Sequence, residues 1–300
     1  MRAISPGSPG HPGAAQLGPG ALRAAHRRRS PPVRGSRAGW GAGAVIPAVV
    51  LTDLDGTLLE EDGTLAEEAR EVLARCAAAG VPVCPVTSKT CAELDDLLAL
   101  VGSEGAGFEN GAGVRHADGH VDLMPAAVPL DELRRVLAAL RRATGLALPS
   151  LEELDDEALA AITCLPRQRL AAVRRRLATL PVVAPPETDE LLRDALPHDP
   201  PVRLLRGNRF LHLQGRHGKA DVVPLLLHRL HCRPGPVVAC GDAPNDIELL
   251  AAAHLRIIVP GEAGPHPELC RRFPDARVAP HPHGRGWAAA VGELLAGGES

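Results

Sequence analysis

Four aspartates could act together, although they lie far apart in the sequence. Asp53 and Asp55 follow one short apolar segment, and Asp242 and Asp246 follow another. Burying an unpaired carboxylate is costly, and two carboxylates about 4 Å apart repel by roughly 4 kcal/mol at an effective dielectric constant of about 20. A hard divalent cation removes this repulsion, and ligands that are all oxygen atoms suit magnesium. We therefore predict that the four aspartates form a site for Mg²⁺.

A third group of polar residues suits an anion. Thr87, Ser88 and Lys89 follow the apolar segment 81–86 and offer hydroxyl groups, an ammonium and backbone amides near a predicted helix start. Lys89 and Lys219 are the only lysines among 33 basic residues, which indicates either a need for a compact ammonium or chance in an arginine-rich chain. Metal, hydroxyl groups, lysines and surplus carboxylates together indicate phosphoryl transfer from a monoester, with one aspartate as nucleophile.

Each of these motifs also has a simpler interpretation when it is taken alone. The Asp-Gly sequence at residues 55–56 could be a turn after a strand, and Thr87 could be an ordinary hydroxyl at a strand end. Asn245 or Asp246 could cap a helix. The order of the motifs and their common position after apolar segments favour the joint interpretation.

The elements that must position these residues alternate between strands and helices from residue 47 onwards. The apolar and β-branched segments 48–52, 81–86 and 237–240 predict buried strands. Apolar residues at helical spacing predict helices at 65–79, near 130–144 and near 154–178. Such alternation predicts an α/β fold with a parallel sheet and right-handed crossovers. The carboxyl edge of that sheet would bring the polar residues together.

The composition of the chain argues against several classes of protein. A net charge of −3 over 300 residues gives no reason to expect a nucleic acid or an anionic membrane as partner. No apolar run approaches 18 residues, so no membrane span is expected. Seven scattered cysteines without CxxC spacing indicate reduced thiols and a cytoplasmic location. The expected partner is a small phosphorylated molecule, and no feature specifies an oligomeric state.

The first 46 residues differ from the rest of the chain. They are rich in Gly, Pro, Ala and Arg and contain no acidic residue. Such a segment cannot bury enough apolar surface to order itself. We therefore predict that residues 1–46 are a disordered tail or precede the true start of the protein.

The motifs, in their order, resemble those of the haloacid dehalogenase superfamily. DLDGTL at 53–58 matches its first motif, Thr87 the second, Lys219 the third and GDAPND at 241–246 the fourth. They resemble in particular the magnesium-dependent phosphatases of this superfamily that have a large cap inserted between the second and third motifs. PVTSKT, ENGAGV, NRFLHLQG and GRGW further resemble mannosyl-3-phosphoglycerate phosphatase.

This resemblance implies a fold and a domain organisation. The core would be a Rossmann-like parallel sheet formed by residues 47–123 and 211–295. An inserted α+β cap domain of the C2 type would occupy residues 124–210, and residues 296–300 would be a C-terminal tail.

The resemblance also implies roles for the acidic residues. Asp53 would be the nucleophile that forms an aspartyl-phosphate, and Asp55 would give a proton to the leaving alkoxide and later take one from water. Asp53 and Asp242 would bind Mg²⁺, with Asp55 contributing its backbone carbonyl to the metal. Asp246 and Asn245 would orient the groups bound to the metal.

The remaining residues would bind the phosphate and the rest of the substrate. Thr87 and Lys219 would hold the phosphoryl oxygens, and Ser88 and Asn245 would lie in the same substrate site. Lys89 would stand at the mouth of the site, where it could bind a glycerate carboxylate or strengthen the phosphate site.

Departures from the family pattern affect the substrate more than the chemistry. The sequence around Lys219 is Gly-Lys-Ala-Asp, where the family usually has Asp-Lys-Gly-Lys, and residues 157–176 of the cap follow the pattern only loosely. Mannosyl-3-phosphoglycerate is the expected substrate. The alternatives are another sugar phosphate, such as glucosyl-3-phosphoglycerate or sucrose phosphate, or a catalytically silent sugar-phosphate binding protein.

Overall fold

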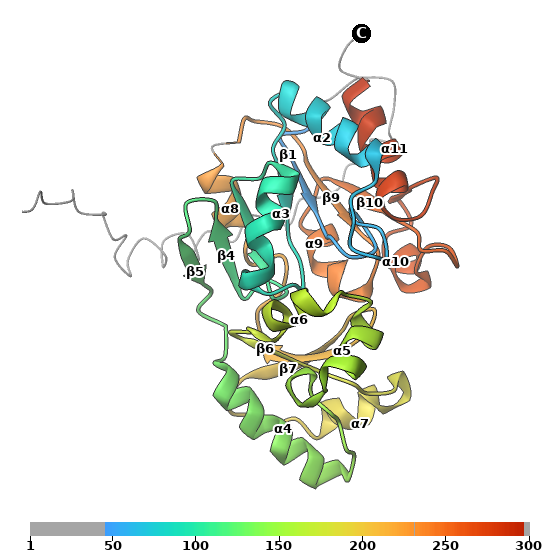
Figure 1. Ribbon diagram of the computed structural model, residues 1–300. Coiled ribbons are helices and arrows are strands. Elements are labelled where there is room, and N and C mark those ends of the chain that lie inside the picture. The colour runs from blue at the N-terminus through green and yellow to red at the C-terminus, as the bar shows by residue number, and fades with distance from the viewer. Residues whose placement is uncertain (1–45, 231, 297–300) are drawn as a thin grey trace, which may run out of the picture. The chain divides into compact units, whose positions relative to one another are not determined.

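The structure, a computed structural model, describes residues 46–230 and 232–296 (Figure 1). Within these residues, the central sheet has five strands in the order β11-β10-β9-β1-β2, and all of its pairings are parallel. The strands are β1 (Val49–Thr52), β2 (Val83–Pro85), β9 (Val237–Gly241), β10 (Leu255–Ile258) and β11 (Arg277–Val278). The predicted α/β fold with a Rossmann-like parallel core is confirmed.

Helices cover both faces of this sheet. On one face, Val50 and Val238 pack with apolar residues of α2 (Glu67–Ala78), α3 (Leu94–Val101) and α11 (His283–Ala296). On the other face, Val49 and Leu51 pack with α8 (Val223–Arg229), α9 (Ile247–Ala251) and α10 (Pro267–Arg272). Burial on both faces explains why β1 is apolar at nearly every position instead of alternating.

A small antiparallel sheet follows the second core strand. Its strands are β3 (Gly105–Phe108), β4 (Gly113–His116) and β5 (Val121–Leu123), in that order. A parallel bridge between Val86 and Gly107 connects this sheet to the end of β2. The turn between β3 and β4 holds Glu109 and Asn110, which lie close to the site described below.

The inserted unit has its own sheet and its own apolar core. Strands β6 (Thr179–Val182), β8 (Leu211–Gly215) and β7 (Val202–Arg206) form an antiparallel sheet in that order. The helices of the unit are α4 (Leu130–Thr144), α5 (Asp156–Thr163), α6 (Arg167–Arg174) and α7 (Asp189–Asp194). We call this α+β unit the cap; it holds the green and yellow elements α4 to α7 in Figure 1.

The boundaries given above for core and cap stay predictions. Residues 211–215, which those boundaries assign to the core, pair here as β8 with both other strands of the cap sheet. The predicted tail at 1–46 lies outside the described residues except for Ile46, as does all of the predicted C-terminal tail except Ala296.

The predicted helical region near 154–178 is not continuous. The structure has two helices there, α5 and α6, separated by a break. Cys164 ends α5 with a left-handed backbone, φ 57°, and Pro166 directly precedes α6. Proline lacks the amide proton that a continuous helix needs, and it disfavours helical geometry at the residue before it.

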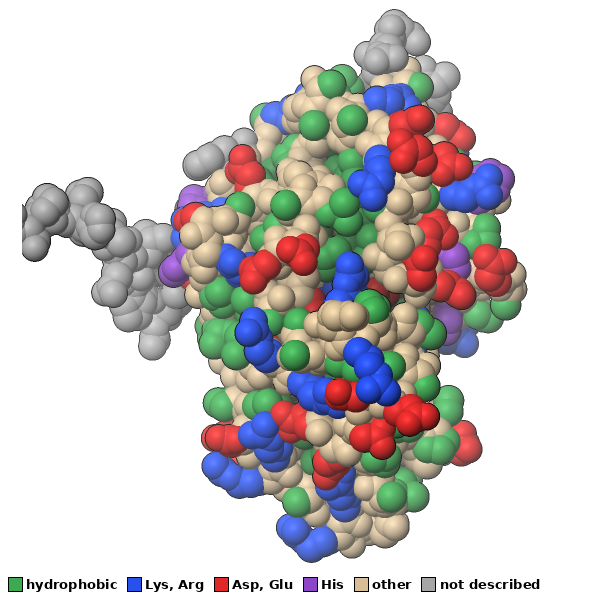
Figure 2. Space-filling view, viewed as in Figure 1, with side chains coloured by type: hydrophobic (Ala, Val, Ile, Leu, Met, Phe, Trp, Pro, Cys, Tyr) green, Lys and Arg blue, Asp and Glu red, His purple; other side chains and the backbone are tan. Residues whose placement is uncertain are grey.

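Two further properties bear on the predicted environment of the protein. Among residues 46–230 and 232–296, no helix combines the length and the apolar character needed to cross a bilayer. All seven cysteines fall in these ranges, and none of them forms a disulfide. Figure 2 shows basic and acidic side chains mixed over the cap in that view.

Candidate active site

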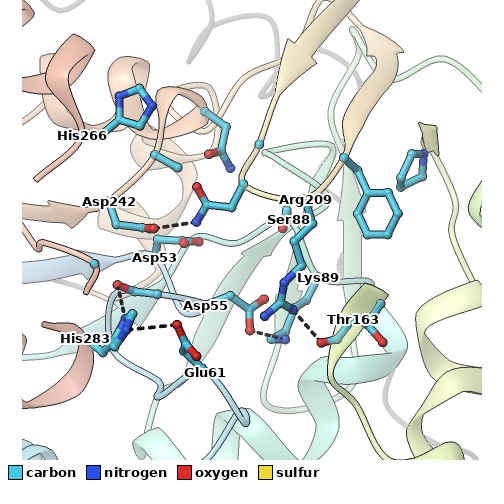
Figure 3. A pocket seen from close by; sticks show the side chains of 18 of the residues that line it. Asp53, Asp55, Glu61, Ser88, Lys89, Thr163, Arg209, Asp242, His266 and His283 are labelled. Carbon is cyan, nitrogen blue, oxygen red and sulfur yellow. Dashed lines mark hydrogen bonds and ion pairs between the residues drawn. The ribbon is translucent and has the colours of Figure 1, made fainter. Parts of the chain in front are cut away.

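The sheet topology brings the two acidic motifs together. β1 and β9 are adjacent parallel strands with Thr52 opposite Cys240, so the residues that follow them emerge at the same edge. One carboxylate oxygen each of Asp53, Asp242 and Asp246 lies within 4.8 Å of the others. Figure 3 shows Asp53 beside Asp242 at this edge, with Asp55 nearby.

Lys219 joins two of these carboxylates from behind. Its fully buried ammonium donates hydrogen bonds to Asp53 Oδ1 at 2.7 Å and to Asp246 Oδ1 at 2.6 Å. The other oxygen of Asp246 accepts the backbone N–H groups of Asp242 and Ala243 at 3.0 and 3.1 Å. Both oxygens of Asp246 are therefore engaged, which suits a residue that orients its neighbours.

Asp242 is held in place by neutral donors. Thr57 Oγ1 donates to its Oδ1 at 2.9 Å, and Asn208, from the cap, donates to its Oδ2 at 2.6 Å. The backbone of Gly56 passes so close that an added Cβ would lie 2.6 Å from Asp242 Oδ2. Gly56 also has φ +83°, so both its conformation and its surroundings favour glycine.

The electrostatics of this cluster indicate too little positive charge. Burial, together with Asp246 and Asp242, raises the pKa of Asp53 well above its usual value, although Lys219 opposes the rise. Burial and the charge of Asp246 raise the pKa of Asp242 to about 7, although Asn208 and Thr57 oppose the rise. A divalent cation would supply the missing charge.

The donor set also fits Mg²⁺. Asp53 and Asp242 offer carboxylate oxygens at the edge of the cavity, and hard oxygen donors are what this ion prefers. Asn245 offers a further oxygen, because its buried Oδ1 has no hydrogen-bond partner among the described residues, while its Nδ2 donates to Asn110 Oδ1 at 3.2 Å. These residues could therefore hold the metal that the sequence predicts.

Asp55 and Lys89 form a second acid–base pair. Lys89 Nζ lies 2.7 Å from Asp55 Oδ1 (Figure 3). Glu93 lies 3.9 Å from the same nitrogen. Burial lowers the pKa of Lys89, but Asp55 and Glu93 outweigh that effect and raise it overall. Lys89 therefore carries its charge, and that charge is directed at Asp55.

The remaining predicted residues lie behind or beside this pair. Thr87 is fully buried, and its Oγ1 accepts the backbone N–H of Lys89 at 3.2 Å. Ser88 lines the cavity together with Lys89 and Asn245. The backbone carbonyl of Ser88 accepts a hydrogen bond of 2.6 Å from Arg176 Nη2, which comes from the cap.

Core and cap enclose a cavity of about 790 Å³ in front of these residues. We call its two sides the core wall and the cap wall. The acidic residues of the core wall are Asp53, Asp55, Glu60, Glu61, Glu93, Asp242 and Glu262. The titratable residues of the cap wall are Arg176, Arg209 and His212. The cavity is therefore acidic on the core side and basic on the cap side.

The sequence reasoning assigned no role to several residues around this cavity. Arg176 has no local motif, whereas Asn208, Arg209 and His212 lie in NRFLHLQG, which carried the resemblance but no assigned role. Glu109, in ENGAGV, is a fully buried acid with a positive φ of 47°, a combination that only the structure reveals.

Glu109 fastens the cap to the core. Its carboxylate accepts the backbone N–H groups of Leu177 and Ala178 at 2.7 and 2.9 Å and the hydroxyl of Thr179 at 2.8 Å. These residues directly follow Arg176, so Glu109 fixes the turn that places the arginine. On the core wall, His283 also has a positive φ of 50°, and its buried Nε2 makes no hydrogen bond among the described residues.

Known proteins share this architecture. Residues 50–143 match the family of haloacid dehalogenase-like hydrolases. A phosphatase of the haloalkanoate superfamily from Bacteroides thetaiotaomicron has a similar structure, with a TM-score of 0.65, 20% identity, and coverage of 88% of this chain and 99% of that one. A sugar phosphatase of subclass IIB gives a TM-score of 0.62 at 17% identity, covering 82% and 98% of the two chains.

The chain therefore shares its fold with these proteins, and residues 50–143 match the haloacid dehalogenase-like hydrolases. The predicted resemblance to the haloacid dehalogenase superfamily is confirmed by the family match over residues 50–143, and the similar structures confirm the fold. A third similar structure, from Thermotoga maritima, has a TM-score of 0.58 at 15% identity and covers 82% of this chain and 96% of that one.

Proposed function

We propose that the protein is a Mg²⁺-dependent phosphatase that hydrolyses a phosphorylated sugar derivative, with mannosyl-3-phosphoglycerate as its substrate. The observation that carries this proposal is the arrangement of Asp53. Its carboxylate lies on the core wall, next to Asp242 and 2.7 Å from the buried ammonium of Lys219. A nucleophile with a metal site on one side and a fixed cation behind it suits attack on a phosphate dianion.

The first half of the reaction transfers the phosphoryl group to the protein. A carboxylate oxygen of Asp53 forms a bond to phosphorus while the bond from phosphorus to the leaving oxygen breaks. Asp55 gives its proton to that oxygen, so the leaving group departs as a neutral alcohol. Lys219 stays beside Asp53 throughout, and Thr87 and Lys219 stabilise the phosphoryl oxygens. Bound Mg²⁺, held by Asp53 and Asp242, would neutralise charge that develops on the phosphoryl group.

The second half returns the protein to its starting state. A water molecule attacks phosphorus, the bond to Asp53 breaks, and Asp55 accepts the proton that the water loses. Lys89 Nζ, 2.7 Å from Asp55 Oδ1, holds that carboxylate in place for the transfer.

The sugar assignment rests on a narrower set of observations. The sequence segments that resemble mannosyl-3-phosphoglycerate phosphatase supply residues of both walls, including Lys89 and Arg209. The subclass IIB relative is a sugar phosphatase. Glucosyl-3-phosphoglycerate and sucrose phosphate remain the alternative substrates. A silent binding protein would not need Asp53, Asp55 and Lys219 together. The seven free cysteines support a reducing compartment, the cytoplasm.

Steady-state kinetics on four esters tests the proposal. The full chain with Mg²⁺ is assayed on mannosyl-3-phosphoglycerate, glucosyl-3-phosphoglycerate, sucrose phosphate and p-nitrophenyl phosphate. We expect the highest kcat/KM for the mannosyl ester. A higher value for another sugar ester would identify that ester as the substrate and would still support phosphatase activity. No turnover of any ester would favour the silent binding protein.

The metal is tested separately from the sugar. We expect activity on every ester to vanish in excess chelator and to return with Mg²⁺, with Ca²⁺ a poor substitute because it prefers more ligands in looser geometry. Mg²⁺ should also raise the Tm, since it binds the folded carboxylate cluster. Asp242→Asn should reduce that rise, and full activity in excess chelator would contradict the proposed metal site.

A further inference from the structure

Two buried side chains of the cap wall lack hydrogen-bond partners for some of their polar atoms. Arg176 and His212 are only 7% and 5% exposed, and both line the cavity. Buried polar groups normally find partners, and each one that does not requires an explanation. Of their unpaired atoms, His212 Nδ1 is fully buried, whereas Arg176 Nη1 and His212 Nε2 are accessible, and a ligand in the cavity would give these two atoms a partner.

Arg176 uses only part of its guanidinium to hold itself in place. Its Nε donates to Thr179 Oγ1 at 2.8 Å, and its Nη2 donates to the carbonyl of Ser88 at 2.6 Å. Within the described parts of the chain, its Nη1 makes no hydrogen bond. Glu109 fixes the turn that follows Arg176, so this free nitrogen belongs to a rigidly held group.

The imidazole of His212 makes even fewer hydrogen bonds than the guanidinium of Arg176. No hydrogen bond to either ring nitrogen occurs within the described residues, and Nδ1 is fully buried. His212 lies on β8 directly opposite Pro181 of β6, the strand that begins three residues after Arg176. Burial, followed by the charges of Arg176, Lys219 and Arg206, lowers the pKa of His212 to about 3. The ring is therefore a neutral imidazole with one N–H donor.

The charge of the cavity indicates what these donors would bind. The cap wall has no acidic residue, whereas the core wall is rich in them. The carboxylate nearest to Arg176 is the buried Glu109, 4.0 Å from its Nε on the side away from the free Nη1. A guanidinium nitrogen and a neutral imidazole N–H suit a carboxylate, and arginine is well matched to that group. Lys89 is less available for this purpose because Asp55 already lies 2.7 Å from its ammonium.

We propose that Arg176 and His212 form a subsite that binds a carboxylate on the leaving group of the substrate. This inference rests on the proposed function and deepens it, because it assigns the selection of the leaving group to two residues of the cap. Mannosyl-3-phosphoglycerate carries such a carboxylate, and sucrose phosphate does not. The subsite is separate from the phosphate site, whose residues belong to the core.

The test compares two esters that differ only in this charge. The substrates are mannosyl-3-phosphoglycerate and its carboxyl methyl ester, and p-nitrophenyl phosphate reports on the core chemistry alone. We expect the protein to prefer the carboxylate over the methyl ester by roughly 10- to 100-fold in kcat/KM, the effect of a charge-assisted hydrogen bond. No such preference would overturn the inference while leaving the phosphatase intact.

The first variant, His212→Phe, keeps the ring shape and removes both nitrogens. Since His212 donates no hydrogen bond to the protein, we expect the Tm of His212→Phe to equal or exceed that of the wild type. The preference for the carboxylate should fall about tenfold, and turnover of p-nitrophenyl phosphate should stay within about twofold of wild type. A lower Tm with equal losses on all three esters would show a merely structural role and overturn the inference.

The second variant, Arg176→Gln, should remove most of the preference. Because Arg176 also contacts the core, Arg203→Gln is the matched control. Arg203 joins the cap to Glu248 of the core at 2.6 and 2.9 Å but does not line the cavity. We expect Arg203→Gln to keep the preference. Loss of the preference in Arg203→Gln to the same extent would overturn the inference.

Two further outcomes are informative. Arg209→Gln changes the other arginine of the cap wall, which is exposed and donates to the carbonyl of Thr163. If only this variant lost the preference, Arg209 would bind the carboxylate and the inference would be wrong.

If the mannosyl ester is not hydrolysed, the same ratio is measured for 3-phosphoglycerate and glycerol 3-phosphate, and an equal rate for both would overturn the inference.

Discussion

The two walls of the cavity differ in charge and in the way the fold builds them. The core wall presents seven carboxylates, and Asp53 and Asp242 directly follow adjacent parallel strands. The cap wall presents two arginines and a neutral histidine, positioned by an antiparallel sheet and the turn that Glu109 holds. One wall therefore suits a cation and phosphoryl transfer, and the other suits an anionic group of the substrate.

This difference separates the chemical step from the choice of substrate. A change in the core wall should slow every ester by the same factor, because all esters share the phosphoryl group. A change in the cap wall should alter the ratio between esters, because only the leaving group reaches that wall. Each prediction below tests which of these two effects a residue has.

The largest effect is expected from Asp53→Asn. The amide keeps the shape of the side chain but is a poor nucleophile, so kcat should fall by roughly 10⁴-fold or more on every ester. Asp62→Asn is the matched control, because Asp62 is exposed and lies in the same region of the chain. Steady-state assays on the carboxylate ester and p-nitrophenyl phosphate measure both losses. Turnover near wild type in Asp53→Asn would refute the assignment of the nucleophile.

A smaller but still large effect is expected from Lys219→Met. The fully buried ammonium contacts both Asp53 and Asp246, so its loss should slow all esters by on the order of 10²-fold or more. The variant should also lose about 3–5 kcal/mol of stability, because two buried carboxylates lose their partner. Kinetics on two esters and denaturant unfolding check these results. A loss confined to one ester would place Lys219 in substrate selection.

The sequence was sufficient to predict that Asp53 and Asp242 lie together on the core wall, for a physical reason. The strand at 49–52 is apolar because it is buried on both faces, and it ends where acids begin. The same pattern recurs at 237–241, and parallel strands share one carboxyl edge. Local patterns therefore located Asp53 and Asp242, and the topology rule placed them together.

The cap wall could not be predicted in this way. Arg176 lies in a segment that reads as one long helix, and its place depends on the break at Pro166 and on hydrogen bonds to Ser88 and Thr179. His212 reaches the cavity only because β8 pairs with β6. Contacts between distant segments leave no local signal of a residue's role: NRFLHLQG, which includes His212, indicated only a family resemblance, and the sequence directed attention to Lys89 instead.

Lys89→Met tests that earlier assignment. Lys89 contacts Asp55 at 2.7 Å, so its loss should impair proton transfer for every ester by about tenfold and leave the ratio between the carboxylate ester and its methyl ester unchanged. Both esters are assayed in the variant and in wild type. A selective loss on the carboxylate ester would show that Lys89, and not the cap wall, binds the carboxylate, as the sequence alone allowed.

The smallest effect concerns stability against acid. Measuring it tests whether His212 of the cap wall is neutral, and this test needs no substrate. The folded protein keeps His212 neutral, with a pKa of about 3, whereas an unfolded chain protonates histidine below about pH 6.5. The unfolded state therefore binds more protons between these values, and stability falls as the pH falls through this window. Between pH 6.5 and pH 5, His212 should account for about 2 kcal/mol of that loss.

Replacing the titrating group should remove its share of the pH dependence. The free energy of unfolding, measured with urea at pH 6.5 and pH 5, should fall by about 2 kcal/mol less in His212→Phe than in wild type. His212→Gln separates titration from hydrophobicity, because its absolute stability will differ while its dependence on pH should match that of His212→Phe. An unchanged pH dependence in both variants would mean that His212 is not held neutral, and the cap wall would then carry a third positive charge in acid.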